Sequence, residues 1–72
     1  MDMIVKVTFK GRVKKDTIID DIKVHAESIE AAREMVQRWI SISPGLRGNS
    51  GLFHPGNGYG KIKIKSVKRV KE

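Results

Sequence analysis

The sequence predicts an α+β domain of order ββαβ, in which a three-stranded antiparallel sheet of order 2-1-3 carries one helix packed on one face. Three observations lead to this fold. Two neighbouring segments alternate between apolar and polar residues, as half-buried strands do, and a third segment near the end of the chain does the same. Between them, apolar residues recur at helical spacing. With 72 residues and no cysteine, we expect a single domain over residues 1–72 without disulfides.

The first two strands are expected at residues 3–13 and 17–26, with a hairpin turn between them. Period two and β-branched side chains favour strands in both segments. The apolar face of the second strand contains one discordant residue, Asp20. We expect either a bulge near Asp20 or an inward-pointing charge on an edge strand to resolve this conflict.

A helix is expected at residues 28–42. Ser28 is a favourable N-cap, and Pro44 with Gly45 should end the helix, because proline cannot continue it and glycine suits the C-terminal cap. Residues at spacings of three and four form one predicted apolar stripe: Ile29, Ala32, Val36, Trp39 and Ile40.

The segment between helix and last strand is rich in glycine. Residues 43–60 hold six of the seven glycines and both prolines, and a loop of this length is usually functional or disordered. Residues 61–70 then alternate again, with a shift near Val67 that indicates a bulge. Phe53 and Tyr59 lie in this loop, where they could stack on a ligand, anchor a partner or fold back onto the core.

The charge balance favours polyanionic partners. The chain carries a formal net charge of +7, and residues 61–72 alone contribute six basic and one acidic side chain. Adjacent strands lie about 4.8 Å apart, so lysines of the first and third strands should form one basic stripe on the face that the helix leaves open. Lys23 is expected on this face as well. The predicted nucleic-acid-binding residues are Lys6, Lys10, Arg12, Arg47, Tyr59, Lys61, Lys63, Lys65, Lys68 and Arg69.

Two other interpretations of the stripe stay open. Lysines on an edge strand prevent edge-to-edge aggregation, and a basic face also fits the acidic surface of a protein partner. The glycine-rich segment does not match a nucleotide-binding loop, because its spacing is wrong and no Ser or Thr follows Lys61.

Catalysis is not expected. His25 is predicted on the solvated side of a strand, and His54 lies in the loop, where nearby Ser50 is a possible but unfavoured partner for nucleophilic catalysis. Asp20 and Asp21 are adjacent, so in a strand they point to opposite faces and cannot act as a dyad. No spacing of His or carboxylates suggests a metal site, and no cofactor is expected.

The residues at 24–32 carry a resemblance. Their sequence, VHAESIEAA, resembles the strand-to-helix transition of small phage-encoded α+β proteins, which include inhibitors of host enzymes and anti-CRISPR proteins. Such proteins commonly block a nucleic-acid-binding surface. The resemblance implies a binding protein rather than an enzyme, and it assigns no functional residue.

Taken together, the residues predict a small, basic, non-catalytic binding protein that contacts the phosphates of DNA or RNA. The alternative is a phage-type inhibitor or adaptor that docks its basic face on an acidic or nucleic-acid-binding host protein. No spanning segment or signal peptide is visible, so we expect no membrane partner and a cytoplasmic location, in the host cytoplasm if the protein is viral. Homodimerisation is a further possibility, because small domains without covalent cross-links often associate.

Overall fold

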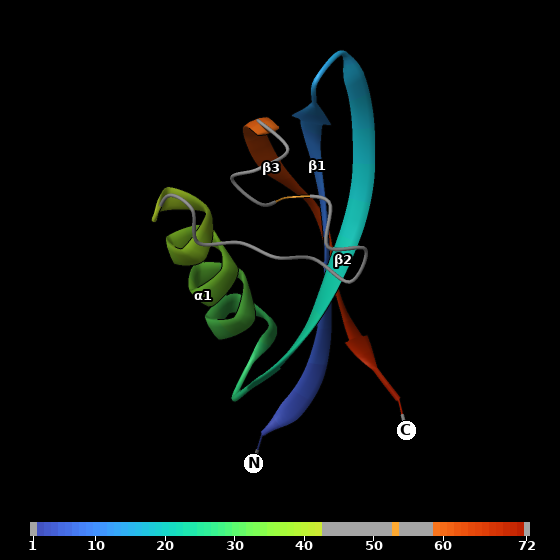
Figure 1. The fold of residues 1–72 in the computed structure, drawn as a ribbon. Coiled ribbons are helices and arrows are strands. Elements are labelled where there is room, and N and C mark those ends of the chain that lie inside the picture. Colours follow the sequence, from blue (N-terminus) through green and yellow to red (C-terminus); the bar gives the residue numbers. More distant parts are fainter. Residues whose placement is uncertain (1, 43–52, 54–58, 72) are drawn as a thin grey trace.

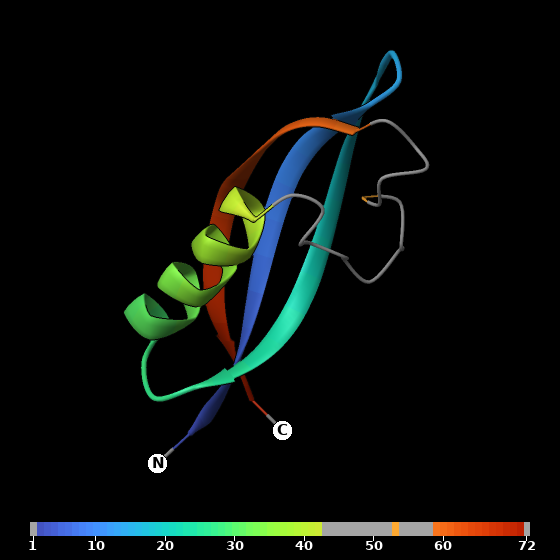
Figure 2. The same cartoon turned by 60° about the vertical axis from the view of Figure 1, so that its left-hand side comes forward.

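A computed structural model describes residues 2–42, 53 and 59–71 (Figure 1). The elements are β1 (Met3–Val13), β2 (Asp16–Ala26), α1 (Ile29–Ser41) and β3 (Tyr59–Val70). The strands form one sheet of order β2-β1-β3 with antiparallel neighbours, which confirms the predicted α+β fold. Figures 1 and 2 show α1 lying across one face of this sheet.

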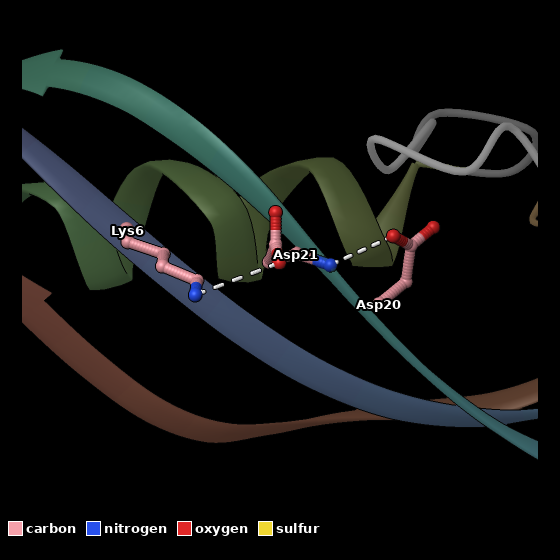
Figure 3. Close-up of polar contacts among 3 residues, drawn as sticks. All are labelled: Lys6, Asp20 and Asp21. Atoms are coloured by element: carbon pink, nitrogen blue, oxygen red, sulfur yellow. Dashed lines mark hydrogen bonds and ion pairs between the residues drawn. The ribbon is translucent and has the colours of Figure 1, made fainter.

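The hairpin of β1 and β2 runs in an unbroken register, from Val13 opposite Asp16 to Met3 opposite Ala26. The predicted bulge near Asp20 is therefore wrong. Instead Asp20 lies opposite Phe9 on the covered face and is only 7% exposed, which confirms the other prediction of an inward-pointing charge. Its Oδ1 accepts a hydrogen bond from the backbone N–H of Asp21 at 2.8 Å (Figure 3).

The hairpin turn itself consists of two lysines. Lys14 has a φ of 57°, in the left-handed region where a side chain is unfavourable and glycine is preferred. Asp16, expected in the turn, already belongs to β2.

The pairing of β1 with β3 contains two irregularities. Thr8 lies opposite Ser66 and Phe9 lies opposite Ile64, so Lys65 has no opposite residue in β1 and forms a bulge. This agrees with the shift expected in the last strand. A second irregularity falls between Gly11 and Val13, and β3 begins at Tyr59 rather than at residue 61.

The helix begins where its cap predicts. The Ser28 side chain accepts a hydrogen bond from the Ala31 N–H at 3.0 Å, and the extended residue Ile42 ends the helix. Pro44 and Gly45, the predicted helix stop, lie outside the described residues. Ile29 was expected in the apolar stripe but is 42% exposed, because the helix residues that pack on the core begin two to three positions later, at Ala31 and Ala32.

The core lies between α1 and the covered face of the sheet, and it includes Phe53 from the segment after the helix. Phe53 is fully buried, in a T-shaped arrangement with Phe9 in which the ring centroids are 5.3 Å apart. Of the three roles open to Phe53, folding back onto the core is therefore the correct one. A Cβ on Gly11 would meet Phe53 Cε1 at 2.7 Å, so the backbone of β1 makes room for this ring only because residue 11 is glycine. The buried apolar residues are Val5, Val7, Phe9, Val24, Ala26, Ala32, Val36 and Phe53.

Candidate nucleic-acid interface

The sheet face opposite α1 is called the open face here. Residues directly opposite each other in neighbouring strands share a face, and successive residues of a strand alternate. Val5, Val7 and Phe9 are buried beneath α1, so the even-numbered residues of β1 point to the open face. With their cross-strand partners they define it as Ile4, Lys6, Thr8, Lys10 and Arg12 of β1, Thr17, Ile19, Asp21, Lys23 and His25 of β2, and Lys63, Ser66, Lys68 and Val70 of β3.

Three lysines lie in one row across the open face. Lys6 of the central strand is directly opposite Lys23 of β2 on one side and Lys68 of β3 on the other. Directly opposite residues have Cβ atoms about 4.5–5.5 Å apart, so the three ammonium groups share one small region. One carboxylate offsets part of this charge: Asp21 Oδ2 lies 3.8 Å from Lys6 Nζ, with both side chains partly exposed (Figure 3).

A second basic row lies further along β1. Lys10 is opposite Lys63, and Thr8 between the two rows is opposite Ser66. Lys6 and Lys10 are four residues apart, which corresponds to roughly 13 Å along a strand. The open face thus carries two groups of ammonium ions separated by a row that holds the hydroxyls of Thr8 and Ser66 and the carboxylate of Asp21.

The position of these lysines bears on the alternative of edge protection. Edge protection accounts for cations on β3, because β3 is an edge strand. It does not account for Lys6 and Lys10, because β1 is the central strand and both of its edges are paired. Placing like charges opposite one another opposes folding, so the rows are not explained by stability of the sheet.

The structure does not bring all predicted residues together. Lys68 and Arg69 are adjacent in β3, and Arg69 is opposite the buried Val5, so its register position belongs to the covered face. Lys61 and Lys65 are exposed but lie at the two irregularities of the β3 register. Tyr59 begins β3 opposite Val13, and Arg47 lies outside the described residues.

Lys23 was expected on this face but not among the phosphate-binding residues. Residues 1–27, which include Lys23, carry nearly balanced charge, whereas the positive excess of the sequence is concentrated at residues 61–72. Only the pairing of β2 with β1 shows that Lys23 is next to Lys6.

A shallow depression lies at the end of the sheet where β1 begins and β3 ends, and it is lined by residues from both the open-face and the covered-face register positions. Its volume is about 480 Å³. Ile4 and Val70 of the open face contribute apolar surface, and Arg69 and Lys71 contribute positive charge. The depression therefore combines apolar contact with anion attraction one row away from Lys6. The lining residues are Asp2, Met3, Ile4, His25, Arg69, Val70 and Lys71.

Within residues 2–42, 53 and 59–71, no three His, Cys, Asp or Glu side chains are grouped closely enough to hold a metal ion. Asp20 and Asp21 lie on opposite faces of β2, as their adjacency predicts. Among the described residues no helix has the length and apolar character needed to cross a membrane.

Comparisons of the chain with protein-family models, curated proteins and solved structures give no match. The resemblance of residues 24–32 to phage-encoded α+β proteins therefore stays a prediction. In the structure this segment is the end of β2, the Ser28 cap and the start of α1.

Proposed function

We propose that the protein is a non-catalytic nucleic-acid-binding protein that holds phosphates on the open face. The observation that carries the proposal is the row of Lys23, Lys6 and Lys68, centred on a strand that needs no edge protection. Ammonium groups neutralise backbone phosphates and release their counterions, which supplies binding free energy without reading sequence. The hydroxyls of Thr8 and Ser66 lie between the basic rows and can donate hydrogen bonds to phosphate oxygens.

The aromatic residues support backbone contact rather than base stacking. Single-strand-binding proteins commonly place aromatic rings among their basic residues. Here Phe9 and Phe53 are buried and Trp39 packs against the core, so none of these three rings belongs to the open face. We therefore expect little sequence preference, with DNA and RNA distinguished weakly.

A salt titration tests the proposal. If the five open-face lysines each contact a phosphate, the slope of log K against log salt is about −3.5 for single strands and about −4.5 for B-DNA. Fluorescence anisotropy with labelled single-stranded and duplex oligonucleotides of both DNA and RNA, between about 50 and 200 mM salt, measures this slope.

Two triple variants distinguish the contribution of the open face to binding affinity from that of total charge. K6Q/K10Q/K63Q removes three cations from the open face, and K15Q/R33Q/R38Q removes three exposed cations elsewhere. We expect the open-face variant to lose at least about tenfold in affinity and about 2–3 units of salt slope, and the control to lose much less. Equal losses, or no binding by the unaltered protein at low salt, would overturn the proposal.

The second candidate is a protein-binding inhibitor or adaptor, acting in the cytoplasm of a host if the protein is viral. Ile19, opposite Lys10, is 54% exposed on the open face, which offers apolar contact that a phosphate backbone does not use. Capture of partners from nuclease-treated lysate distinguishes the two. A stoichiometric protein partner that survives nuclease and is lost in Ile19→Ser favours this candidate, whereas loss of all partners on nuclease treatment favours nucleic acid.

A further inference from the structure

The two edges of the sheet differ in how they are protected against pairing. The edge strand β3 has two register irregularities and five basic residues, features that discourage another strand from adding there. The other edge strand, β2, pairs with β1 in an unbroken register over Asp16–Ala26 and contains a single lysine, Lys23. By these criteria, and as far as the described residues show, β2 is the edge better able to accept a strand.

The register also shows which backbone groups of β2 point outward. The two-residue turn is flanked by Val13 and Asp16, which form the closing hydrogen-bonded pair of such a hairpin. Hydrogen-bonded pairs then alternate, so even-numbered residues of β2 bond to β1 and odd-numbered residues direct N–H and C=O to the outer edge. The N–H of Asp21 agrees with this, because it bonds to Oδ1 of Asp20 and not to β1.

From this edge we infer that β2 pairs antiparallel with β2 of a second copy of the chain, about a two-fold axis at Ile22. In this register Asp21 of each copy is opposite Lys23 of the other, which gives two symmetric ion pairs on the open face. On the covered face Ile22 meets its own equivalent and Ile18 meets Ala26. Ile18 and Ile22 are only partly buried in the single chain, so pairing covers apolar surface that remains accessible.

Neighbouring registers are less favourable because of charge. Moving the axis to Asp21 places two aspartates opposite each other, and moving it to Lys23 does the same with two lysines. Moving it to Asp20 opposes two carboxylates on the covered face. Among these, only the axis at Ile22 pairs opposite charges on the open face and opposes no like charges on the covered face.

The paired sheet would keep its open faces together. A two-fold axis perpendicular to the sheet puts both helices on one side and both open faces on the other, in one six-stranded sheet. Figures 1 and 2 both show α1 over the β1 and β3 side, clear of the outer edge of β2 at mid-strand. Pairing replaces the local hydrogen bond between the Asp21 N–H and Asp20 by an interstrand hydrogen bond, so the net gain is small. We therefore expect reversible dimerisation with a dissociation constant of about 10 μM to 1 mM.

Charge-exchange variants test the register in the absence of nucleic acid. Asp21→Lys alone places lysines opposite each other at positions 21 and 23 of the two copies, and Lys23→Asp alone places aspartates there. Each variant by itself should therefore be monomeric by sedimentation velocity. An equimolar mixture restores both ion pairs, because each Lys then meets an Asp, and should sediment as a heterodimer. Circular dichroism confirms that each variant is folded.

A second measurement uses the unaltered protein. Raising its concentration should slow amide hydrogen exchange at Ile19, Asp21, Lys23 and His25, whose N–H groups join the new pairing, by severalfold. A monomer throughout the concentration range, a dimer that both single variants retain, or no heterodimer in the mixture would overturn the inference. Because no nucleic acid is present, these outcomes are independent of the proposed function.

Discussion

Alternate residues of the same strands build the two faces of the sheet, and the faces contribute opposite terms to the free energy of folding. On the covered face, Val5 and Val7 are fully buried, and the removal of their side chains from water stabilises the folded state. On the open face, Lys6 between Lys23 and Lys68 places like charges together, which opposes folding. Stability and anion attraction are therefore separable in this protein, and substitutions on each face should affect one property more than the other.

The largest expected effect is on the covered face at Phe53. Phe53→Ala removes a fully buried ring and its edge contact with Phe9, and should lower the free energy of unfolding by about 3–5 kcal/mol. Urea denaturation followed by circular dichroism measures the change. As a matched control, Ile42→Ala removes a side chain that is 56% exposed and should cost less than about 1 kcal/mol. Equal losses in the two variants would contradict burial of Phe53.

A smaller loss of stability is expected at Gly11, where the backbone makes room for the Phe53 ring. Gly11→Ala puts a methyl group 2.7 Å from Phe53 Cε1 and 3.2 Å from the Lys61 carbonyl oxygen, and should destabilise by about 1–3 kcal/mol. Gly60→Ala is the control, because among the described residues its Cβ would meet Arg12 Cβ at 3.7 Å, an ordinary contact. The midpoints of thermal unfolding should fall for the first variant and change little for the second. An unchanged midpoint for Gly11→Ala would show that Phe53 can move aside.

The hairpin turn belongs to neither face, and a substitution there should raise rather than lower the stability of the fold. Lys14→Gly relieves a non-glycine residue at a φ of 57° and should raise the free energy of unfolding by roughly 1 kcal/mol. Lys15→Gly removes an equal charge where φ is not positive, so it should not stabilise. If both variants had the same effect in chemical denaturation, charge rather than backbone conformation would be the cause.

The smallest expected effect on stability lies on the open face. Lys68→Gln removes one of three neighbouring ammonium groups and should raise the free energy of unfolding by a few tenths of a kcal/mol at low salt. About 1 M salt screens the repulsion and should abolish the gain. Lys15→Gln, in the turn, is the control for net charge. A gain for Lys68→Gln that persists at high salt would show that its origin is not repulsion within the row.

The local features were the predictable ones. Period-two alternation was sufficient to locate β1 at Met3–Val13, and the hydroxyl of Ser28 was sufficient to locate the start of α1. Alternation also identified Asp20 as the discordant residue of its strand, but it left a bulge and an inward-pointing charge as alternatives, and the unbroken register of the hairpin decided for the second.

The contacts between segments distant in the chain were not predictable from the sequence. Nothing in the alternation indicates that Phe53 contacts Phe9, because the two residues are far apart along the chain and the sequence of the glycine-rich segment that contains Phe53 has no periodicity. The same holds for the lysine row: alternation placed Lys6 and Lys23 on one face, but their direct opposition depends on the register of two strands.

The sequence by itself therefore determined which residues are strand or helix and which side chains of each strand share a face, because those properties depend on backbone periods within one segment. The tertiary structure alone decided which charges become neighbours and which aromatic ring completes the core. The physical reason is that strand register and loop placement are set by packing between segments distant in the chain. The lysine row on the central strand, on which the proposed function rests, is a product of that register.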